Sequence, residues 1–423
     1  VEDPKDHMAG VRIYDVSNPR APRLVKNVQT CKGSHTHTVI PHPRDKGVVY
    51  IYVSGSQNAR EAMEGCVNGE DPADPNNSLY RLDIIRVPLA NPAQAAVVGG
   101  ARIFTGIEAA PQREGRQSRR PGGPRNCHDV TAYPAMNLLA GACGSYGLMV
   151  DITDPENPRR LDAVADTNFS LWHTAVFSND GRKVLFTDEW GGGTGPMCQA
   201  TSPMEMGGNT VLTIGEGGTM TQHAYFKIPT GQAATENCVS HNGSLIPIPG
   251  RDVAVQGWYQ GGVNIIDFSD PDDPFEIAYF DRGPIDAPPE EGDTARRGRG
   301  TIGGSWGAYW YNGYIYSSEM ARGLDILELV PTAYISANEI AAAKLVMMDE
   351  FNPQSQPHIT WPAAFPVVRS YLDQLNRVQG LPGERLGAID RALIAAEGQR
   401  GAARSRALTT LAGELERDVN GAR

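Results

Sequence analysis

Short extended runs, and not helical stripes, dominate the pattern of hydrophobic and polar positions over the first three quarters of the chain. β-Branched, aromatic and aliphatic residues gather in runs of five to seven positions, and each run stops at a turn residue. Asn179-Asp180-Gly181 and Asn312-Gly313 have the composition of hairpin turns and are flanked by such runs on both sides. The pattern predicts antiparallel strand pairs that are joined by tight turns.

A second type of run ends in Asn-Pro or Asp-Pro and is followed by another extended run. Proline fixes φ and keeps the preceding residue out of the helical region, so this dipeptide forces a turn. Three clear and two weaker copies occur, at residues 10–25, 147–161, 262–280, 80–98 and 323–331. A hairpin followed by one such copy makes a tandem unit of four short strands, which is typical of a β-propeller.

The repeats also give a blade count and a boundary. Full repeats begin near His35, His128, His173, His241 and Trp306. Residues 10–25 supply only the outer half of a further blade, and we expect upstream sequence or another segment to complete it, because an open sheet edge is a liability. The sequence therefore predicts an all-β fold, a six- or seven-bladed β-propeller over residues 1–331 whose first blade is incomplete.

After residue 331 the apolar residues recur at helical spacing. Ser336 and Glu339 form a capping box before the first helix, and further helices are expected over residues 384–397 and 403–418. We expect residues 332–423 to be an α-helical C-terminal extension that docks on the propeller up to residue 380. The remainder is expected to be a loosely attached, solvated tail, with an oligomer-forming segment as the alternative.

The three clear copies resemble the LVIVD-repeat family of bacterial β-propellers. They read GVRIYDVSNPRAPRL, GLMVDITDPENPRRL and GVNIIDFSDPDDPFEI, and the resemblance covers residues 10–330. It implies the propeller fold and an exported protein. It implies no particular chemistry, so the candidate site has to come from the residues themselves.

Composition and charge exclude several classes of function. The 423 residues include 47 glycines and 31 prolines, too many for a helical bundle, and carry a net charge of -11, which disfavours nucleic acid as a partner. No apolar stretch approaches the roughly 20 residues that cross a bilayer. No phosphate loop or dinucleotide fingerprint is present, so no nucleotide cofactor is expected.

Six cysteines indicate an oxidising compartment. Their number is even and no Cys-x-x-Cys motif occurs, which favours disulfides over a zinc ribbon or a thioredoxin site. Of the 15 possible pairings, the nearest-neighbour one needs the least chain excursion: Cys31–Cys66, Cys127–Cys143 and Cys198–Cys238. Buried free thiols in a cytosolic protein are the alternative. We expect a secreted, periplasmic or cell-surface protein whose chain starts after its signal sequence.

One column of histidines stands out when the hairpins are aligned on their turns. Its members lie six residues before a turn-side residue in each repeat: His35, His128, His173 and His241, with Trp306 in the fifth. The first strand of each propeller blade lines the central channel, so these side chains are expected to converge. Imidazole suits copper and zinc, and the column, with His37 and Glu189 as further ligands, predicts a transition-metal site.

Other residues near the column are candidates for ligand binding. Asp129 follows His128 and Glu319 ends the fifth hairpin, so both place a carboxylate near the channel. Trp258 and Trp306 are aromatic candidates for stacking on a ring-shaped ligand, although inter-blade core is the more common role of such residues. Glu189 precedes three glycines, a sequence that suits either an acidic loop at the channel mouth or an ordinary turn.

Two functions stay open at this point. The first is a metal-dependent oxidoreductase or hydrolase that acts on a small molecule in the channel. In geometry alone the ring is similar to the histidine-lined propeller of selenium-binding protein, a copper-dependent methanethiol oxidase, which implies a redox-active metal. The second is a non-catalytic scaffold that presents loops to a protein or glycan. There, tandem duplication would have copied a histidine that merely hydrogen-bonds within its blade.

Overall fold

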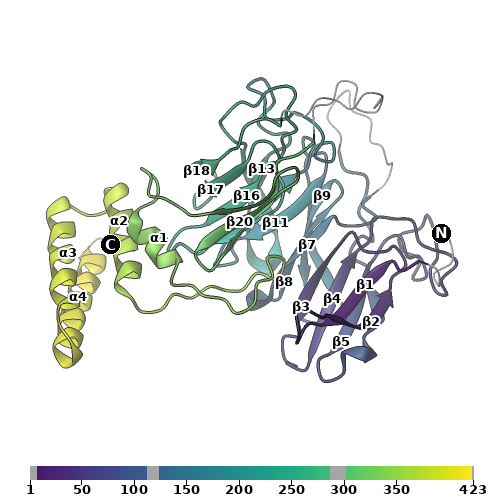
Figure 1. Cartoon of the computed structure of the whole chain (residues 1–423), viewed down its shortest axis with the longest axis horizontal. Coiled ribbons are helices and arrows are strands. Elements are labelled where there is room, and N and C mark those ends of the chain that lie inside the picture. The colour runs from purple at the N-terminus through teal and green to yellow at the C-terminus, as the bar shows by residue number, and fades with distance from the viewer. Residues whose placement is uncertain (1–6, 112–122, 286–301, 422–423) are drawn as a thin grey trace.

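The computed structural model describes residues 7–111, 123–285 and 302–421. It consists of antiparallel sheets with a helical layer at one end (Figure 1). Five of the sheets follow one another along the chain, and in each of them every strand pairs with its sequence neighbour. Tandem meanders of this kind are the blades of a β-propeller, which confirms the all-β propeller class.

Four blades have four strands and the fifth has three. Blade one contains β3 (Thr36–Pro41), β4 (Val48–Ser54), β5 (Leu82–Pro88) and β6 (Ala96–Ala101). Blade two contains β7 (Asp129–Tyr133), β8 (Leu138–Cys143), β9 (Tyr146–Asp151) and β10 (Arg159–Ala165). Blade three contains β11 (Trp172–Phe177), β12 (Lys183–Asp188), β13 (Asn209–Ile214) and β14 (Met220–Phe226). Blade four contains β15 (Gly243–Ile246), β16 (Val253–Gly257), β17 (Val263–Asp267) and β18 (Phe275–Phe280), and blade five contains β19 (Ser305–Tyr311), β20 (Tyr314–Glu319) and β21 (Gly323–Leu327).

The expected count of six or seven blades was wrong, because the residues that the structure describes form five. The segment before them makes a separate two-stranded sheet of β1 (Gly10–Asp15) and β2 (Arg23–Gln29). Val11 and Val28 of this sheet pack on Ile51, Val53 and Ile85 of blade one. In the part of the chain that the structure describes, β1 and β2 pair only with each other, so no inner strands complete a sixth blade.

The apolar core lies between neighbouring blades. One cluster joins blade one to blade two, and the next three join the following pairs of blades in order. Members such as Ile84, Leu139 and Val150 are fully buried. Because both faces of these sheets are covered, their strands read as nearly continuous apolar runs.

A strap, which we define as residues 345–361, crosses the turn end of all five blades. Its residues hydrogen-bond to every blade, and the contacts in chain order are Met348 to Asn312, Asn352 to Val39, Gln354 and Gln356 to Ala132, Gln356 to Phe177, Ile359 to Asn179, and Trp361 to Pro247. Met348, bound to blade five, lies only four positions before Asn352, bound to blade one. The strap therefore links the last blade to the first, and five blades suffice.

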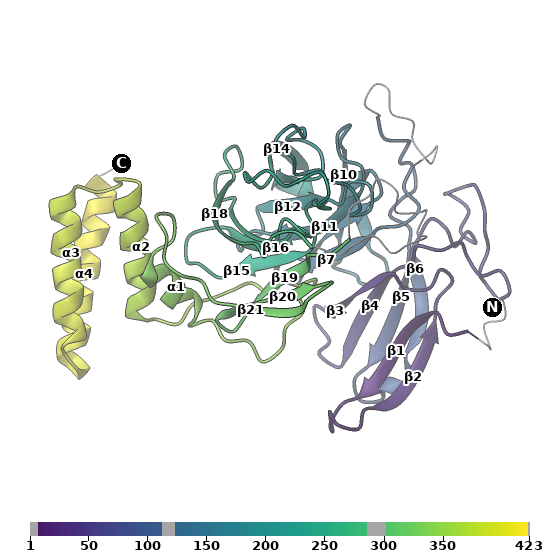
Figure 2. The same cartoon turned by 45° about the horizontal axis from the view of Figure 1, so that its top comes forward.

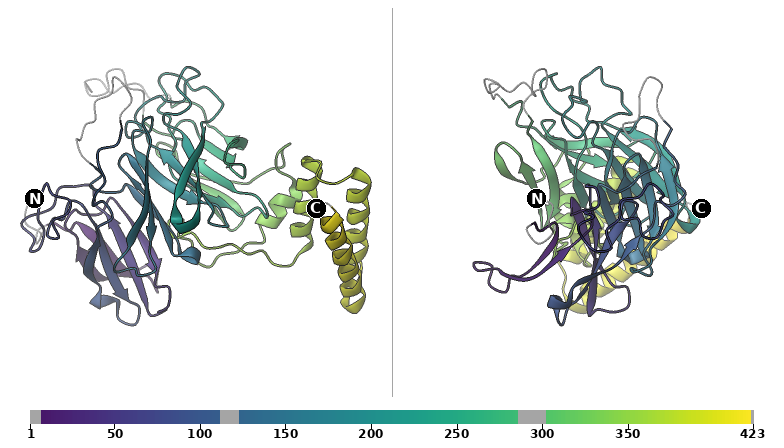
Figure 3. Two further views of the ribbon diagram at one scale, coloured as in Figure 1. Left: turned by 180° about the vertical axis from the view of Figure 1, so that it is seen from behind. Right: turned by 90° about the vertical axis from the view of Figure 1, so that its right-hand side faces the viewer.

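The C-terminal extension contains α1 (Ala337–Ala343), α2 (Phe365–Arg377), α3 (Gly383–Glu397) and α4 (Gly401–Gly421). α1 begins at Ser336 with the predicted capping box. α2, α3 and α4 stand beside the sheets as a separate layer (Figures 2 and 3) and share an apolar cluster that includes Leu372, Leu393 and Leu411. The chain after residue 380 is thus two packed helices, and not the solvated tail that the sequence predicts. No helix in the described ranges has the length and apolarity that a bilayer crossing requires.

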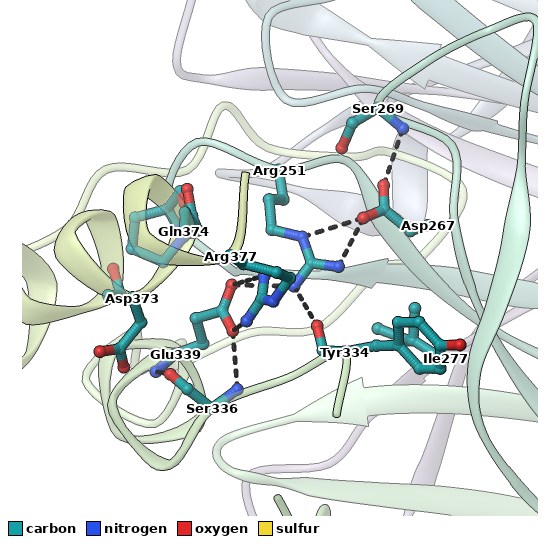
Figure 4. A network of polar contacts seen from close by, with 12 residues as sticks. Arg251, Asp267, Ser269, Ile277, Tyr334, Ser336, Glu339, Asp373, Gln374 and Arg377 are labelled. Carbon is teal, nitrogen blue, oxygen red and sulfur yellow. Dashed lines mark hydrogen bonds and ion pairs between the residues drawn. The ribbon is translucent and has the colours of Figure 1, made fainter. Parts of the chain in front are cut away.

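A buried network of charges fixes the first two helices to blade four (Figure 4). Arg251, from the turn between β15 and β16, donates through two nitrogens to Oδ2 of Asp267 and through a third to Oε1 of Glu339 at 2.8 Å. Arg377 of α2 donates to Oε2 of the same Glu339 at 2.5 Å. Glu339, on α1, is fully buried, so its charge is balanced within the protein by both arginines.

Candidate metal centre

The five column residues come together at the inner end of the blades. Their backbones share one register, since His35, His128 and His241 each donate their N–H to the carbonyl at the end of the second strand of their blade. His173 and Trp306 lie within the first strands, β11 and β19. The ring centroids of successive members are 4.4, 3.8, 4.0 and 4.8 Å apart, so the four imidazoles and the indole form one continuous arc.

Burial differs along this arc. His35 and Trp306, at its two ends, are exposed, whereas His173 and His241 are completely buried. Within the described parts of the chain, three ring nitrogens of these two residues have no hydrogen-bond partner: both nitrogens of His173 and the Nε2 of His241. Buried polar atoms are nearly always satisfied, so unpaired imidazole nitrogens in one place need an explanation. The Nδ1 of His241 does have a hydrogen-bond partner, the backbone carbonyl of Trp306, and its Nε2 points elsewhere.

Glu189 supplies a carboxylate to the buried half of the arc. Its Oε2 lies 3.6 Å from Nε2 of His173, and its Oε1 lies 3.7 Å from Nε2 of His241. Both distances are too long for hydrogen bonds. The oxygen of Tyr259 is 2.5 Å from Oε1 and donates to it. His173, Glu189 and His241 thus form a group whose ligand atoms lie within 4.8 Å of one another.

The chain around Glu189 is held firmly. Asp188 precedes it and accepts three backbone N–H groups, from Ser170, Leu171 and Gly207. The three glycines that follow all have a left-handed backbone, and a Cβ on Gly193 would overlap the Tyr259 hydroxyl. The Glu-Trp-Gly-Gly-Gly sequence is therefore an ordered turn that brings Glu189 and Tyr259 together.

Asp129 forms a second group on the other side of His173. One of its carboxylate oxygens lies within 4.8 Å of a nitrogen of His128 and a nitrogen of His173. Asp129 is 1% exposed. The side chains of Thr36, Thr174 and Gln354 lie near its carboxylate, but in the described residues none of them forms a well-aligned hydrogen bond with it. His35 adjoins this group, because its Nε2 is 2.7 Å from Nε2 of His128.

Burial sets the protonation of these side chains. It lowers the pKa of His128 to about 3 and that of His241 to about 4, and it holds the pKa of His173 well below the usual value. The imidazoles are therefore neutral at pH 7, the form in which histidine binds metals. Burial also raises the pKa of Asp129 to about 6 and that of Glu189 above its ordinary value.

Three candidates from the sequence lie outside both groups. His37 is exposed and its Nδ1 contacts the hydroxyl of Ser34 at 3.2 Å. Trp258 is completely buried in the core between blades three and four. Glu319 accepts the backbone N–H of Gly304 and lines a small cavity with Tyr259 and Arg322. Trp306 contacts His241, as described above.

The contact between Tyr259 and Glu189 is not predicted by the sequence analysis. The two residues lie on different blades and 70 positions apart, outside the repeated positions, so the repeat pattern carries no signal for the pair. The left-handed backbone of Tyr259 is also invisible in the sequence.

Three disulfides tie the loops next to the arc. They are Cys31–Cys66, Cys127–Cys143 and Cys198–Cys238, the pairing that needs the least chain excursion. Cys127 directly precedes His128, and Cys31 and Cys238 come four and three residues before their histidines. Three such bonds are typical of proteins from oxidising, extracytoplasmic environments.

Comparison with known protein families finds no match, and no curated protein matches the sequence. The resemblance to LVIVD repeats therefore stays a prediction. Solved structures with similar folds include a protein of Lactobacillus plantarum, at 10% identity over 77% of this chain and 75% of that one, with a TM-score of 0.44. They also include hydrazine synthase of Kuenenia stuttgartiensis, at 12% identity over 75% and 78% with a TM-score of 0.42. A hypothetical selenium-binding protein of Sulfolobus tokodaii is similar at 12% identity over 64% and 58%, with a TM-score of 0.35. Chemistry is not transferred at such distances, since propellers host many unrelated activities.

Proposed function

We propose that this chain is an exported, LVIVD-type β-propeller that binds a transition-metal ion between His173, His241 and Glu189. The observation that carries the proposal is the spacing between the two Glu189 oxygens and the Nε2 atoms of His173 and His241. Two ligands about 2.1 Å from a tetrahedral metal are about 3.4 Å from each other. The distances of 3.6 and 3.7 Å from the Glu189 oxygens to the two Nε2 atoms suit this geometry and do not suit direct hydrogen bonds.

The state of the ligands also supports binding. A buried carboxylate beside two neutral imidazoles carries an uncompensated negative charge, which is costly unless a cation balances it. His241 donates through Nδ1 to the Trp306 carbonyl, which leaves its Nε2 without a hydrogen and able to bind a metal. Two nitrogens and one oxygen suit zinc and copper, and not the hard cations calcium and magnesium, which prefer oxygen alone.

The site has the form of a catalytic one and not of a closed structural one. Three protein ligands leave a coordination position free for water or a substrate. The exposed His35 and Trp306 at the ends of the arc mark the side from which a small molecule enters. A bound metal in such a site would supply Lewis-acid or redox chemistry, so we propose an oxidoreductase or a hydrolase that acts on a small molecule.

Metal analysis of the protein purified under metal-replete conditions tests this proposal. We expect at least one zinc or copper ion per chain. In His173→Gln we expect the affinity of metal-depleted protein for Zn²⁺ to fall by more than about 100-fold, because even residues behind the ligands are worth 10–100-fold. His223→Gln is the matched control, since this histidine pairs with Asp272 outside the arc.

Absence of metal from the wild-type protein, together with no Zn²⁺ binding in titrations, would overturn the proposal. The arc would then be a packing feature of a non-catalytic scaffold, and the search would turn to protein or glycan partners.

A further inference from the structure

We propose that the same arc holds a second metal ion, at His128 and Asp129 and next to His35, so that the centre is binuclear. The inference rests on the proposed function, because it assumes that the His173, His241 and Glu189 group binds the first ion. It adds a separate set of ligands, with a carboxylate of its own.

The carboxylate of Asp129 is the first observation behind this second position. It is almost completely buried, and across the described residues no donor meets hydrogen-bond geometry with either of its oxygens. An oxygen of Asp129 nevertheless lies within 4.8 Å of ring nitrogens of His128 and His173. The side chains of Thr36, Thr174 and Gln354 lie near enough to act as weak donors, but none of them is charged. A buried carboxylate beside acceptor nitrogens and without a countercharge calls for a cation or a proton.

The contact between His35 and His128 is the second observation. Their Nε2 atoms are 2.7 Å apart, although they belong to different blades. Two imidazole nitrogens that bind one metal at right angles lie about 2.9 Å apart, from metal–nitrogen distances of about 2.05 Å. A hydrogen bond between one N–H and one bare nitrogen would give a similar distance, and the experiment below separates the two cases.

The number of ligands agrees with two ions. Asp129 lies in one group with His128 and His173, and Glu189 lies in another with His173 and His241, while His35 contacts His128. Two histidines and one carboxylate are a complete set of protein ligands for a first-row transition ion with open positions. The arc therefore offers two neighbouring sets that meet at His173.

The position of His35 gives the second ion access to solvent. His35 is exposed, whereas His173 and His241 are buried. The second ion would therefore lie nearer the channel mouth and meet an incoming ligand first. Paired ions of this kind bind bridging oxygen ligands such as phosphate, carboxylate or hydroxide.

Metal stoichiometry of the full-length protein tests the inference. Metal-depleted protein is titrated with Zn²⁺, and its metal content is measured after removal of unbound ion. We expect two ions in the wild type, one in Asp129→Asn and one in Glu189→Gln. Asp272→Asn, which changes an exposed carboxylate beside His223, should keep two. Both site variants preserve side-chain shape, and near-UV circular dichroism checks that each is folded.

Loading the wild type with Cu²⁺ gives a second readout that needs no variant. Two ions that share one centre couple magnetically, so the signal in electron paramagnetic resonance should be weaker than the copper content requires. A single isolated ion would give the full signal.

The outcomes separate the two proposals. One ion in the wild type, with full spectral intensity and no effect of Asp129→Asn, would overturn the second site and leave the first intact. Two ions that persist in Asp129→Asn would overturn the assignment of Asp129. No bound ion in the wild type would overturn the proposed function and this inference together.

Discussion

Tyr259 donates its phenolic hydrogen to Oε1 of Glu189 from a backbone that has a φ of 53°. Left-handed backbone is unusual for an aromatic residue and costs about 1–2 kcal/mol. It is retained because both backbone groups of Tyr259 bond to Ser305 of blade five and the ring packs on His241, with centroids 4.9 Å apart. The strained residue therefore holds the carboxylate with one oxygen toward each buried imidazole.

Removal of this hydroxyl should weaken metal binding more than folding. In Tyr259→Phe, Glu189 loses the donor that orients it, and we expect the affinity for Zn²⁺ to fall by about 10–100-fold, as for other residues behind metal ligands. The absorption spectrum of Co²⁺-loaded protein should shift as well, because the carboxylate geometry changes. Isothermal titration and the Co²⁺ spectrum measure the two effects.

Tyr225→Phe is the control for that variant. Tyr225 also donates to a buried carboxylate, that of Asp166, but it lies on blade three away from the arc. It should lose a similar stability, about 1 kcal/mol, with unchanged affinity for Zn²⁺. Equal affinities in the two variants would show that Tyr259 acts on the fold alone.

The glycine turn after Glu189 offers a second comparison. Gly191 and Gly193 are both left-handed, so alanine at either position should cost about 1 kcal/mol in the free energy of unfolding. Around Gly191 nothing that the structure describes would meet the new methyl group, whereas at Gly193 the methyl would overlap the Tyr259 hydroxyl and approach Glu189. We expect Gly193→Ala alone to reduce Zn²⁺ affinity, measured beside thermal unfolding of both variants. The same loss of affinity in Gly191→Ala would contradict this account.

Much of the fold and the arc could be predicted because the repeats carry a fixed register. The distance of six residues from each histidine to its turn places these side chains at one height on equivalent strands, since strand side chains repeat with a period of two. Asn179-Asp180-Gly181 joins β11 to β12, and Asn312-Gly313 joins β19 to β20, as the turn composition predicts.

The strap and the contact of Tyr259 could not be predicted, because they join segments that belong to no repeat. Gln356 binds both backbone groups of Phe177, 179 positions away, and ring closure depends on such contacts. Local pattern contains no information on which loop crosses the blade ends. The blade count predicted from the sequence is therefore too high, since it treats the half-blade at residues 10–25 as part of a sixth blade.

Acid should destabilise the metal-free protein through its buried histidines. The pKa of His128 is about 3 and that of His241 about 4 in the folded state, against about 6.5 in an unfolded chain, and that of His173 is lowered too. As pH falls below about 6.5, the unfolded state binds protons that the folded state does not, and each histidine removes up to about 1.4 kcal/mol of stability per pH unit.

The two carboxylates oppose this trend. Asp129, with a pKa of about 6, and Glu189 take up protons in the folded state before the unfolded state does, so they add stability as pH falls. The three lowered histidine pKa values outnumber the two raised carboxylate pKa values, so we expect a net loss of stability as pH falls from about 6 to about 4.5. Urea unfolding of wild type and His173→Gln over this range measures it, and the variant should lose less stability than the wild type. A steeper loss in the variant would contradict the assignment.

Loss of the Glu339 charge should release the helical layer from blade four. In Glu339→Gln, Arg377 keeps no carboxylate partner among the described residues, and the Arg251 guanidinium keeps only Asp267. Breaking a buried ion pair by removing one member costs about 3–5 kcal/mol, because the remaining charge stays buried and uncompensated. Glu328→Gln is the matched control, since Glu328 pairs with Lys344 at the surface and its substitution should cost about 0–1 kcal/mol.

Far-UV circular dichroism reports helix content and tryptophan fluorescence reports the blades. Followed together in urea, the two signals distinguish detachment of the helices from unfolding of the blades. A helical signal lost before the fluorescence in Glu339→Gln, and together with it in the wild type, is the expected result. Coincident transitions in the variant would mean that the apolar contacts of α1 with blades four and five, through Ile340 and Ala343, hold the layer in place without the charges.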